Sequence, residues 1–305
     1  NFRNYPMPVV ANTLKTYDQV GLKQDIEDIV YDISPTLTPF TSSIGTGTAS
    51  ATLHQWQTSE LSAVGANAAL EGADAGAASN NTTTMKTANT QIFTKVVQSS
   101  GTSEAVEKHG RDSDLAMNIA MKGKEMRRDI EHAFVGAGQA GTAGNATTAR
   151  QLTSAQNQIN AATTNTAGSN RTFTEALLLG TLQSVYEAGG DPNQIQVTPS
   201  HSVLVANFAA SSGRNRDFST GTKIVNSVDL YVSPFSECAV VPNRFLQANS
   251  CLVLDTEYWS RAVLRPMQTI NLARNGDSEK KQMLTEQTLV CENDKASGLI
   301  NALTA

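Results

Sequence analysis

The histidines are the first residues to consider for metal or acid–base chemistry, and their spacing does not form a site. His54, His109, His132 and His201 lie in four different segments of the chain. None has a second histidine, cysteine or carboxylate at metal-ligand spacing on a shared face. His132 stands beside Glu131 and Asp129, so we interpret it as one more residue on the polar face of a helix.

Three cysteines, Cys238, Cys251 and Cys291, are an odd number at wide spacing. This pattern argues against a secreted disulfide framework and favours buried, reduced thiols. The three carboxylates Asp25, Glu27 and Asp28 could imitate a metal site. However, acidic residues in the first turn of a helix are also favoured by the helix dipole.

One glycine motif remains, because Gly136, Gly138 and Gly141 fit the pattern G-x-G-x-x-G. A dinucleotide site needs a strand before this motif and a helix after it. Here a helical pattern precedes the motif and a Thr/Ala/Asn stretch follows it. The sequence contains no Walker A pattern, G-x-S-x-G elbow or H-E-x-x-H pair. We therefore expect no catalytic, cofactor-binding or metal-binding residues, no cofactor and no enzyme activity.

Composition points to a protein with a neutral surface. Only 17% of the 305 residues are charged, and the formal net charge is −5. A surface rich in Thr, Ser, Asn, Gln, Ala and Gly must result. An acidic chain is not drawn as a whole to nucleic acid or to anionic membranes. No apolar run approaches the ~20 residues that span a bilayer, so we expect no membrane association.

The element around which the chain is organised is a long amphipathic helix over residues 112–136. Its apolar positions recur with helical spacing, and polar residues, including Glu131, occupy the rest. Asp112 or Ser113 is expected to cap its start and Gly136 to end it. The apolar stripe consists of Leu115, Ile119, Met126, Ile130 and Phe134.

The N-terminal residues 1–40 indicate an extended arm with a short helix over Leu22–Ile33. Residues 41–98 predict a projecting two-stranded ribbon with strand limbs at Ala49–Gln57 and Gln91–Gln98. Its middle, Ser62–Thr84, carries only Glu71 and Asp74 as charges. Such a ribbon cannot bury enough apolar surface to be stable alone. It is either a disordered loop or an arm that contact with another subunit orders.

Beyond the long helix, Ala137–Thr172 lacks aromatic residues and is predicted to be an insertion or surface excursion. Residues 173–255 predict a small α/β domain, with helices starting after Thr174 and at Pro199. In the tail, Ala262–Leu272 and Lys280–Val290 form two long strands around Asn275–Gly276, a strong hairpin signal. A last strand, Gly298–Leu303, closes the chain. The long helix is predicted to pack on the hairpin with the closing strand beside it, since the helix and the hairpin each have one apolar side without a partner.

Two segments of the sequence resemble segments of a known protein family. Thr16–Gly45 (TYDQVGLKQDIEDIVYDISPTLTPFTSSIG) resembles the opening segment of the SU-ten-like major capsid proteins of tailed bacteriophages. Gly276–Ile300 (GDSEKKQMLTEQTLVCENDKASGLI) is similar to the closing segment of that family, including Glu286 and Asn293. The resemblance implies an α+β capsid fold of the Hong Kong 97 type.

Under this resemblance, 1–40 is the N-terminal arm and 41–98 the extended loop that overlaps a neighbouring subunit. Residues 99–172 and 256–305 form the peripheral domain, with 112–136 as its spine helix. Residues 173–255 form the axial domain. Some relatives crosslink a loop lysine to an asparagine, but no feature of the sequence marks an activating carboxylate for Lys86. No crosslink is therefore assigned.

The implied function is that of a major capsid protein in the virion. It self-assembles as pentamers and hexamers into the icosahedral or prolate head of a tailed phage, built in the host bacterial cytoplasm. Portal and scaffold proteins are implied partners, and packaged double-stranded DNA is enclosed without sequence-specific binding. The sequence leaves open whether decoration proteins bind. Two alternatives remain: another lattice or tube protein, such as a surface layer or tail tube, and an α/β enzyme with its site in 173–255.

Overall fold

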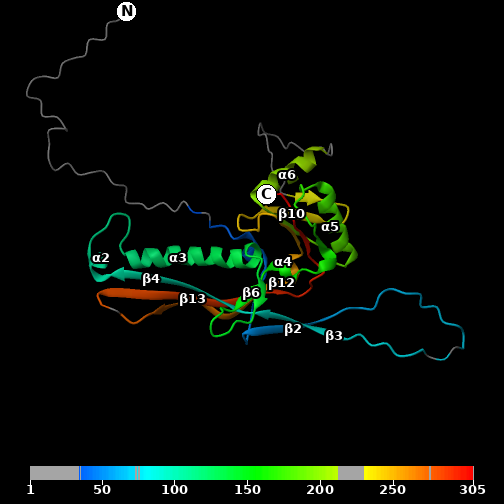
Figure 1. Cartoon of the computed structure of the whole chain (residues 1–305), viewed down its shortest axis with the longest axis horizontal. Helices are drawn as coiled ribbons and strands as arrows, with labels where there is room; N and C mark the ends of the chain where they lie inside the picture. Colours follow the sequence, from blue (N-terminus) through cyan, green and yellow to red (C-terminus); the bar gives the residue numbers. More distant parts are fainter. Residues whose placement is uncertain are drawn as a thin grey trace, which may run out of the picture.

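The computed structural model describes residues 34, 36–72, 74, 76–211, 230–274 and 276–304. The helix expected over Leu22–Ile33, and most of the arm, lie outside the described residues. The described chain combines two larger β-sheets, a long helix and a thin projecting loop, which Figure 1 shows extending away from the body.

The long helix is α3, Asp114–Glu131, and it continues without a break into a π-helical turn, η2, His132–Gly136. The Ser113 hydroxyl accepts a hydrogen bond from the Ala116 N–H and caps the start, as predicted. A side chain at Gly136 would overlap the carbonyl oxygen of Phe245. The predicted helix over 112–136 is thus confirmed, with a wider last turn.

Beneath α3 lies a four-stranded sheet. Its order is β1 (Gly45–Thr48), β12 (Trp259–Asn271), β13 (Ser278–Cys291) and β4 (Gln91–Ser100). Strands β12 and β13 form the predicted antiparallel hairpin, with register shifts between Val263 and Gln268. A Cβ at Gly123 would lie 3.4 Å from the Met283 Cε, an ordinary van der Waals distance, so α3 runs alongside β13 at this point.

Strand β4 corrects two predictions. Gln91–Gln98 was expected to be a limb of the projecting ribbon, but β4 pairs with β13 from Gln91↔Gln287 to Ser100↔Ser278. It also lies nearer to α3 than the hairpin does, and Phe93 joins the core under the helix. The helix therefore packs on β4 and β13, and only in part on the hairpin. Alternating residues indicated a strand correctly, but alternation does not specify its partner.

The projecting loop is built on β2 (Leu53–Ser59) and β3 (Thr83–Asn89). They pair antiparallel, from Leu53↔Asn89 to Ser59↔Thr83, and the chain between them forms the tip seen in Figure 1. The ribbon is thus real but shorter than predicted, because the chain turns at Thr90 to enter the main sheet.

The second sheet has six strands, in the order β7 (Thr164–Asn165), β14 (Gly298–Ile300), β11 (Cys251–Leu254), β8 (Gln194–Val197), β10 (Glu237–Pro242) and β9 (Leu230–Val232). Helices α5 (Glu175–Glu187) and α6 (Pro199–Ser211) pack on it, and both begin where predicted. The closing strand was expected beside the hairpin. It instead joins this sheet, between β11 and β7.

Residues 137–172 were predicted to be an insertion or a surface excursion, and the burial of their middle part corrects the second of these. They form a small hairpin, β5 (Ala140–Thr142) and β6 (Gln151–Thr153), then α4 (Ala155–Gln158) and η3 (Ala161–Thr163). Leu152, Ala155 and Ile159 are buried in the core under α3. Aliphatic side chains are buried here without any aromatic ring, so the absence of aromatic residues did not indicate exposure.

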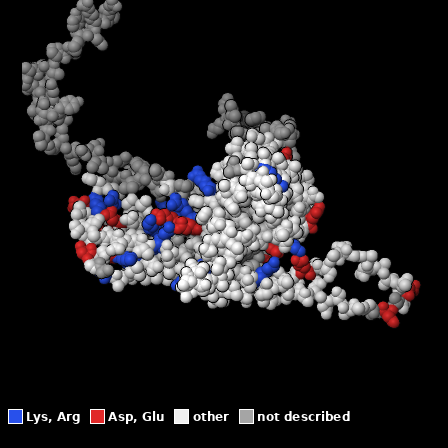
Figure 2. All heavy atoms as spheres, in the orientation of Figure 1, with Lys and Arg blue, Asp and Glu red and all other residues white. Residues whose placement is uncertain are grey.

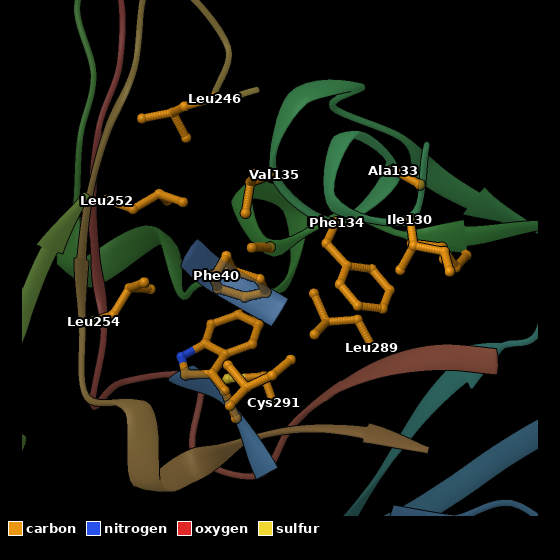
Figure 3. Close-up of a cluster of buried hydrophobic side chains, with 14 of the residues drawn as sticks. Phe40, Ile130, Ala133, Phe134, Val135, Leu246, Leu252, Leu254, Leu289 and Cys291 are labelled. Carbon is orange, nitrogen blue, oxygen red and sulfur yellow. The ribbon is translucent and has the colours of Figure 1, made fainter. Parts of the chain in front are cut away.

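The core under α3 is closed by the short helix α1 (Pro39–Ser43), which inserts Phe40. The Phe40 ring makes edge contacts with Phe134 and Trp259, at centroid distances of 6.2 and 5.8 Å. Figure 3 shows Phe40 surrounded by side chains from α3, η2 and the six-stranded sheet. Alternate residues of β11 serve the two cores: Leu252 and Leu254 face this one, and Cys251 and Val253 face the α5–α6 side.

Candidate assembly site

Glu131, at the end of α3, is buried and lies where three parts of the chain meet. Its carboxylate accepts hydrogen bonds from the N–H groups of Phe40 and Thr41, both at 2.8 Å, and from the Thr41 hydroxyl at 2.5 Å. The Asn243 Nδ2, in the loop after β10, donates a further bond at 2.8 Å. The interpretation of Glu131 as a polar-face residue was therefore wrong. Its carboxylate links α1 and the loop after β10 to the end of α3.

Glu286 makes a second buried junction, at the base of the projecting loop. Its carboxylate accepts bonds from the Thr90 hydroxyl and the Arg265 Nε, both at 2.8 Å, and from the Arg150 guanidinium. Burial pushes the pKa of Glu286 up, but the Thr90 bond and the two arginines outweigh it and hold the pKa below its ordinary value. The ionised Glu286 carboxylate therefore fixes the point where the loop leaves the sheet.

Ion pairs also hold the sides of the loop. Lys86 Nζ on β3 lies 2.9 Å from Asp294 Oδ2, which also accepts a bond from Asn160. Burial raises the pKa of Asp294, but Lys86 and Asn160 lower it more, so the net shift is downward. Lys295 Nζ lies 2.7 Å from Glu60 Oε2 at the end of β2. Lys86 is thus engaged within its own subunit.

Beyond these anchors, the tip of the loop has no core. Leu61, Val64 and Leu70 are 90%, 105% and 84% exposed. Figure 2 shows the tip as a thin, almost uncharged strip with acidic side chains at its far end. A base held by ion pairs and a tip that exposes apolar side chains can bind another protein surface.

The histidines are spread over the structure, as their spacing indicated. His201 is buried, with Nδ1 2.9 Å from the Thr198 hydroxyl and Nε2 2.9 Å from the Thr304 carbonyl. His132 is exposed on η2, and the His54 ring lies 6.0 Å from that of Trp56. Among the described residues, no group of His, Cys, Asp and Glu could hold a metal ion.

The three thiols are free and buried, and burial raises the pKa of each. Gly138 and Gly141 adopt positive φ, and the glycine motif ends inside the strand β5 instead of at the start of a helix. Within the part of the chain that the structure describes, no helix is long and apolar enough to cross a bilayer. The carboxylates Asp25, Glu27 and Asp28 lie outside that part.

The junction residues are the ones that sequence reasoning missed. Glu286 carried a signal, because it belongs to the closing segment that resembles the capsid family. Glu131 carried none beyond its place next to Ile130 at the end of the apolar stripe. Helical periodicity assigns a face to a residue but cannot show that a second chain segment covers that face.

Comparison with known proteins agrees with this geometry. The chain is 26% identical to the major capsid protein of Escherichia phage Phieco32, over 93% of this chain and 95% of that protein. Its structure is similar to a capsid protein of the native GTA particle, with a TM-score of 0.66 at 12% identity, covering 98% and 100% of the two chains. The capsid of cyanophage A-1(L) gives a TM-score of 0.66 at 14% identity, covering 95% and 99%.

The family model described as SU10 major capsid protein matches residues 9–304, almost the whole length of the sequence. Together with the spine helix, the projecting loop and the two sheets, this match establishes that the chain belongs to the SU10 major capsid protein family and has the Hong Kong 97-like fold.

Proposed function

We propose that this major capsid protein builds closed shells of pentamers and hexamers by laying its projecting loop on a neighbouring copy. The proposal rests on the apolar side chains that the tip of the loop exposes. Leu61, Val64 and Leu70 are almost fully exposed, on a strip too thin to bury them within one subunit. Contact with a second copy would remove this apolar surface from water, at about 25 cal/mol per Å².

The buried junctions support the same proposal. Glu286 and Asp294 anchor the base of the loop by charge-assisted hydrogen bonds, which are stronger than neutral ones. A loop whose base is already fixed has fewer arrangements to lose on binding than a loop that is free along its whole length. Its binding therefore loses less conformational entropy.

The parts of the chain have separate roles in this proposal. Residues 1–40 form the N-terminal arm, and 41–98 contain the extended loop. Residues 99–172 with 256–305 form the peripheral domain, and 173–255 the axial domain, which meets its copies at five- and six-fold axes. Three strands pair across these bounds: β1 and β4, from the 41–98 part, pair with the hairpin of the peripheral part, and β14 pairs with β11 of the axial part.

The remaining partners follow from the role in the head. We infer a portal and a scaffold protein as assembly partners, and assembly in the host cytoplasm before the protein resides in the virion capsid. Packaged DNA is enclosed by the wall, and the net charge of −5 supports containment without sequence-specific binding. The role is structural and involves no catalysis.

The proposal is tested by shortening the loop. Residues 62–81 are replaced by a two-residue Asn-Gly turn, which leaves β2 and β3 intact. Because the tip adds no core, the variant should unfold within about 1 kcal/mol of the parent, measured by denaturant titration. Sedimentation should show that the shell fraction is lost.

A full-length variant with Leu61, Val64 and Leu70 all changed to Ser is the matched control for length. It should show the same loss of shells in a folded subunit. Shells that form normally in both variants would contradict the proposed role of the loop. Unfolding of the shortened subunit would show that the tip belongs to a core.

A further inference from the structure

A groove opens where the described N-terminal end of the chain meets the spine helix and the hairpin. It has a volume of about 560 Å³ and is lined by α1, β1, α3, β12 and β13. Ile44, Val263 and Met267 contribute apolar surface, and Met267 is 43% exposed. The lining therefore has an apolar floor that is accessible from outside.

Two arginines stand in the same groove. Arg127 projects from the exposed side of α3, and Arg261 lies on β12, where its Nε donates to the Thr46 hydroxyl at 3.0 Å. Neither forms an ion pair with an acidic group among the described residues. The groove thus presents two positive charges beside an apolar floor.

A buried amide in the groove lacks a partner. Gln287 lines it, is 2% exposed, and its Nε2 has no hydrogen-bond partner among the described residues. A buried donor without a partner costs about 1–3 kcal/mol. An acceptor oxygen supplied by an occupant would remove that cost. The groove therefore favours an occupant that is apolar on one side and carries acceptor oxygens.

The chain itself contains such a segment next to the groove. Thr38 lines the groove, and Leu22–Ile33 precedes it by four residues, which span up to about 14 Å when extended. At helical spacing, Leu22, Ile26, Ile29 and Ile33 share one face. Asp25, Asp28 and Asp32 form a row along one edge of that face. The segment carries four carboxylates against one lysine.

We propose that residues 22–33 dock as an amphipathic helix into this groove of their own subunit. The apolar face covers Val263 and Met267, and the aspartate row faces Arg127 and Arg261. The tether decides in favour of the same subunit, because a short linker gives a far higher effective concentration than a second copy. Docking would cover the exposed part of Met267.

The test uses pairs of introduced cysteines in the full-length protein, since the native thiols are all buried. Ile29→Cys lies on the apolar face of the segment and is paired with Met267→Cys in the groove. Tyr31→Cys with Met267→Cys is the control, because it has nearly the same tether but lies on the polar face. The rate of disulfide formation is read by non-reducing electrophoresis.

We expect a crosslink within one chain that forms at least fivefold faster for Ile29→Cys than for Tyr31→Cys. Equal rates would show an undocked tether and overturn the proposal. A dimer band as the main product would show that a second copy fills the groove, which also overturns it.

The charge contact is tested on the same crosslink. Arg127→Glu should slow it several-fold, and Asp28→Lys in the same chain should restore much of the rate. Arg274→Glu, at a residue near the hairpin turn with 75% of its side chain exposed, is the control and should leave the rate unchanged. Equal effects of Arg127→Glu and Arg274→Glu would contradict docking by charge.

Discussion

At the scale of single residues, two buried carboxylates hold the subunit together. Glu131 joins α1, α3 and the loop after β10, and Glu286 joins the base of the projecting loop to the sheet. Each accepts at least three hydrogen bonds, which compensate for the loss of water around a buried charge. Both residues position chain segments.

Glu131→Ala should destabilise the subunit strongly. The change leaves the N–H groups of Phe40 and Thr41 and the Asn243 amide without their acceptor, at about 1–3 kcal/mol each. We expect a loss of about 3 kcal/mol or more in denaturant unfolding of the subunit. Glu125→Ala, at a partly exposed position of the same helix, is the control and should cost under about 1 kcal/mol. Equal losses would mean that Glu131 is not the junction.

Glu286 should make stability depend on pH. Its pKa is lowered in the folded protein relative to its ordinary value of 4.5. The stability that it contributes is therefore complete above pH 4.5 and is lost as pH falls through the lowered pKa. Glu286→Gln should be less stable at pH 7 by about 1–3 kcal/mol and should decline less steeply below pH 4.5.

The measurement is denaturant unfolding between pH 7 and pH 3. Glu279→Gln, on the same strand but 39% exposed, is the matched control and should follow the parent. If the unfolding free energy declines with equal slope in the parent and in Glu286→Gln, the pH dependence does not come from Glu286.

At the scale of elements, the spine helix is held from one side. Met126, Ile130 and Phe134 are buried against β4, β13 and α1, while Lys124 and Arg127 are exposed. The π-turn at its end carries Phe134 into the core beside Phe40. The helix therefore depends on its apolar stripe.

Phe134→Ala or Ile130→Ala should cost about 2–5 kcal/mol, the usual range for emptying a buried core position. Lys124→Ala should change the unfolding free energy little, because the side chain is exposed. Thermal unfolding of the subunit checks both. Normal melting of Phe134→Ala together with collapse of Lys124→Ala would mean that the helix is turned the other way.

Most of the helices and the hairpin could be predicted from the spacing of apolar residues in the sequence. The spine helix, α5, α6 and the hairpin follow from local spacing and from caps such as Ser113. Strand partners could not, because Gln91–Ser100 and Gly298–Ile300 pair with segments that local pattern does not identify. Burial of Glu131 was equally hidden, since the segment that covers it lies 90 residues away.

At the scale of the whole molecule, the isolated subunit leaves apolar side chains exposed to water. The loop tip exposes Leu61, Val64 and Leu70, and the groove beside α1 exposes Met267 next to two arginines. The low charge of the chain, 17%, suits a protein whose surface is mostly covered by its copies. Membership of a capsid family and these open surfaces lead to the same expectation.

Electron microscopy of the expressed full-length protein, alone and with its scaffold and portal partners, tests the central claim most directly. We expect closed shells with five-fold and six-fold clusters, in which the loop of each subunit lies on its neighbour. Tubes or flat lattices, or a stable monomer under every one of these conditions, would contradict it.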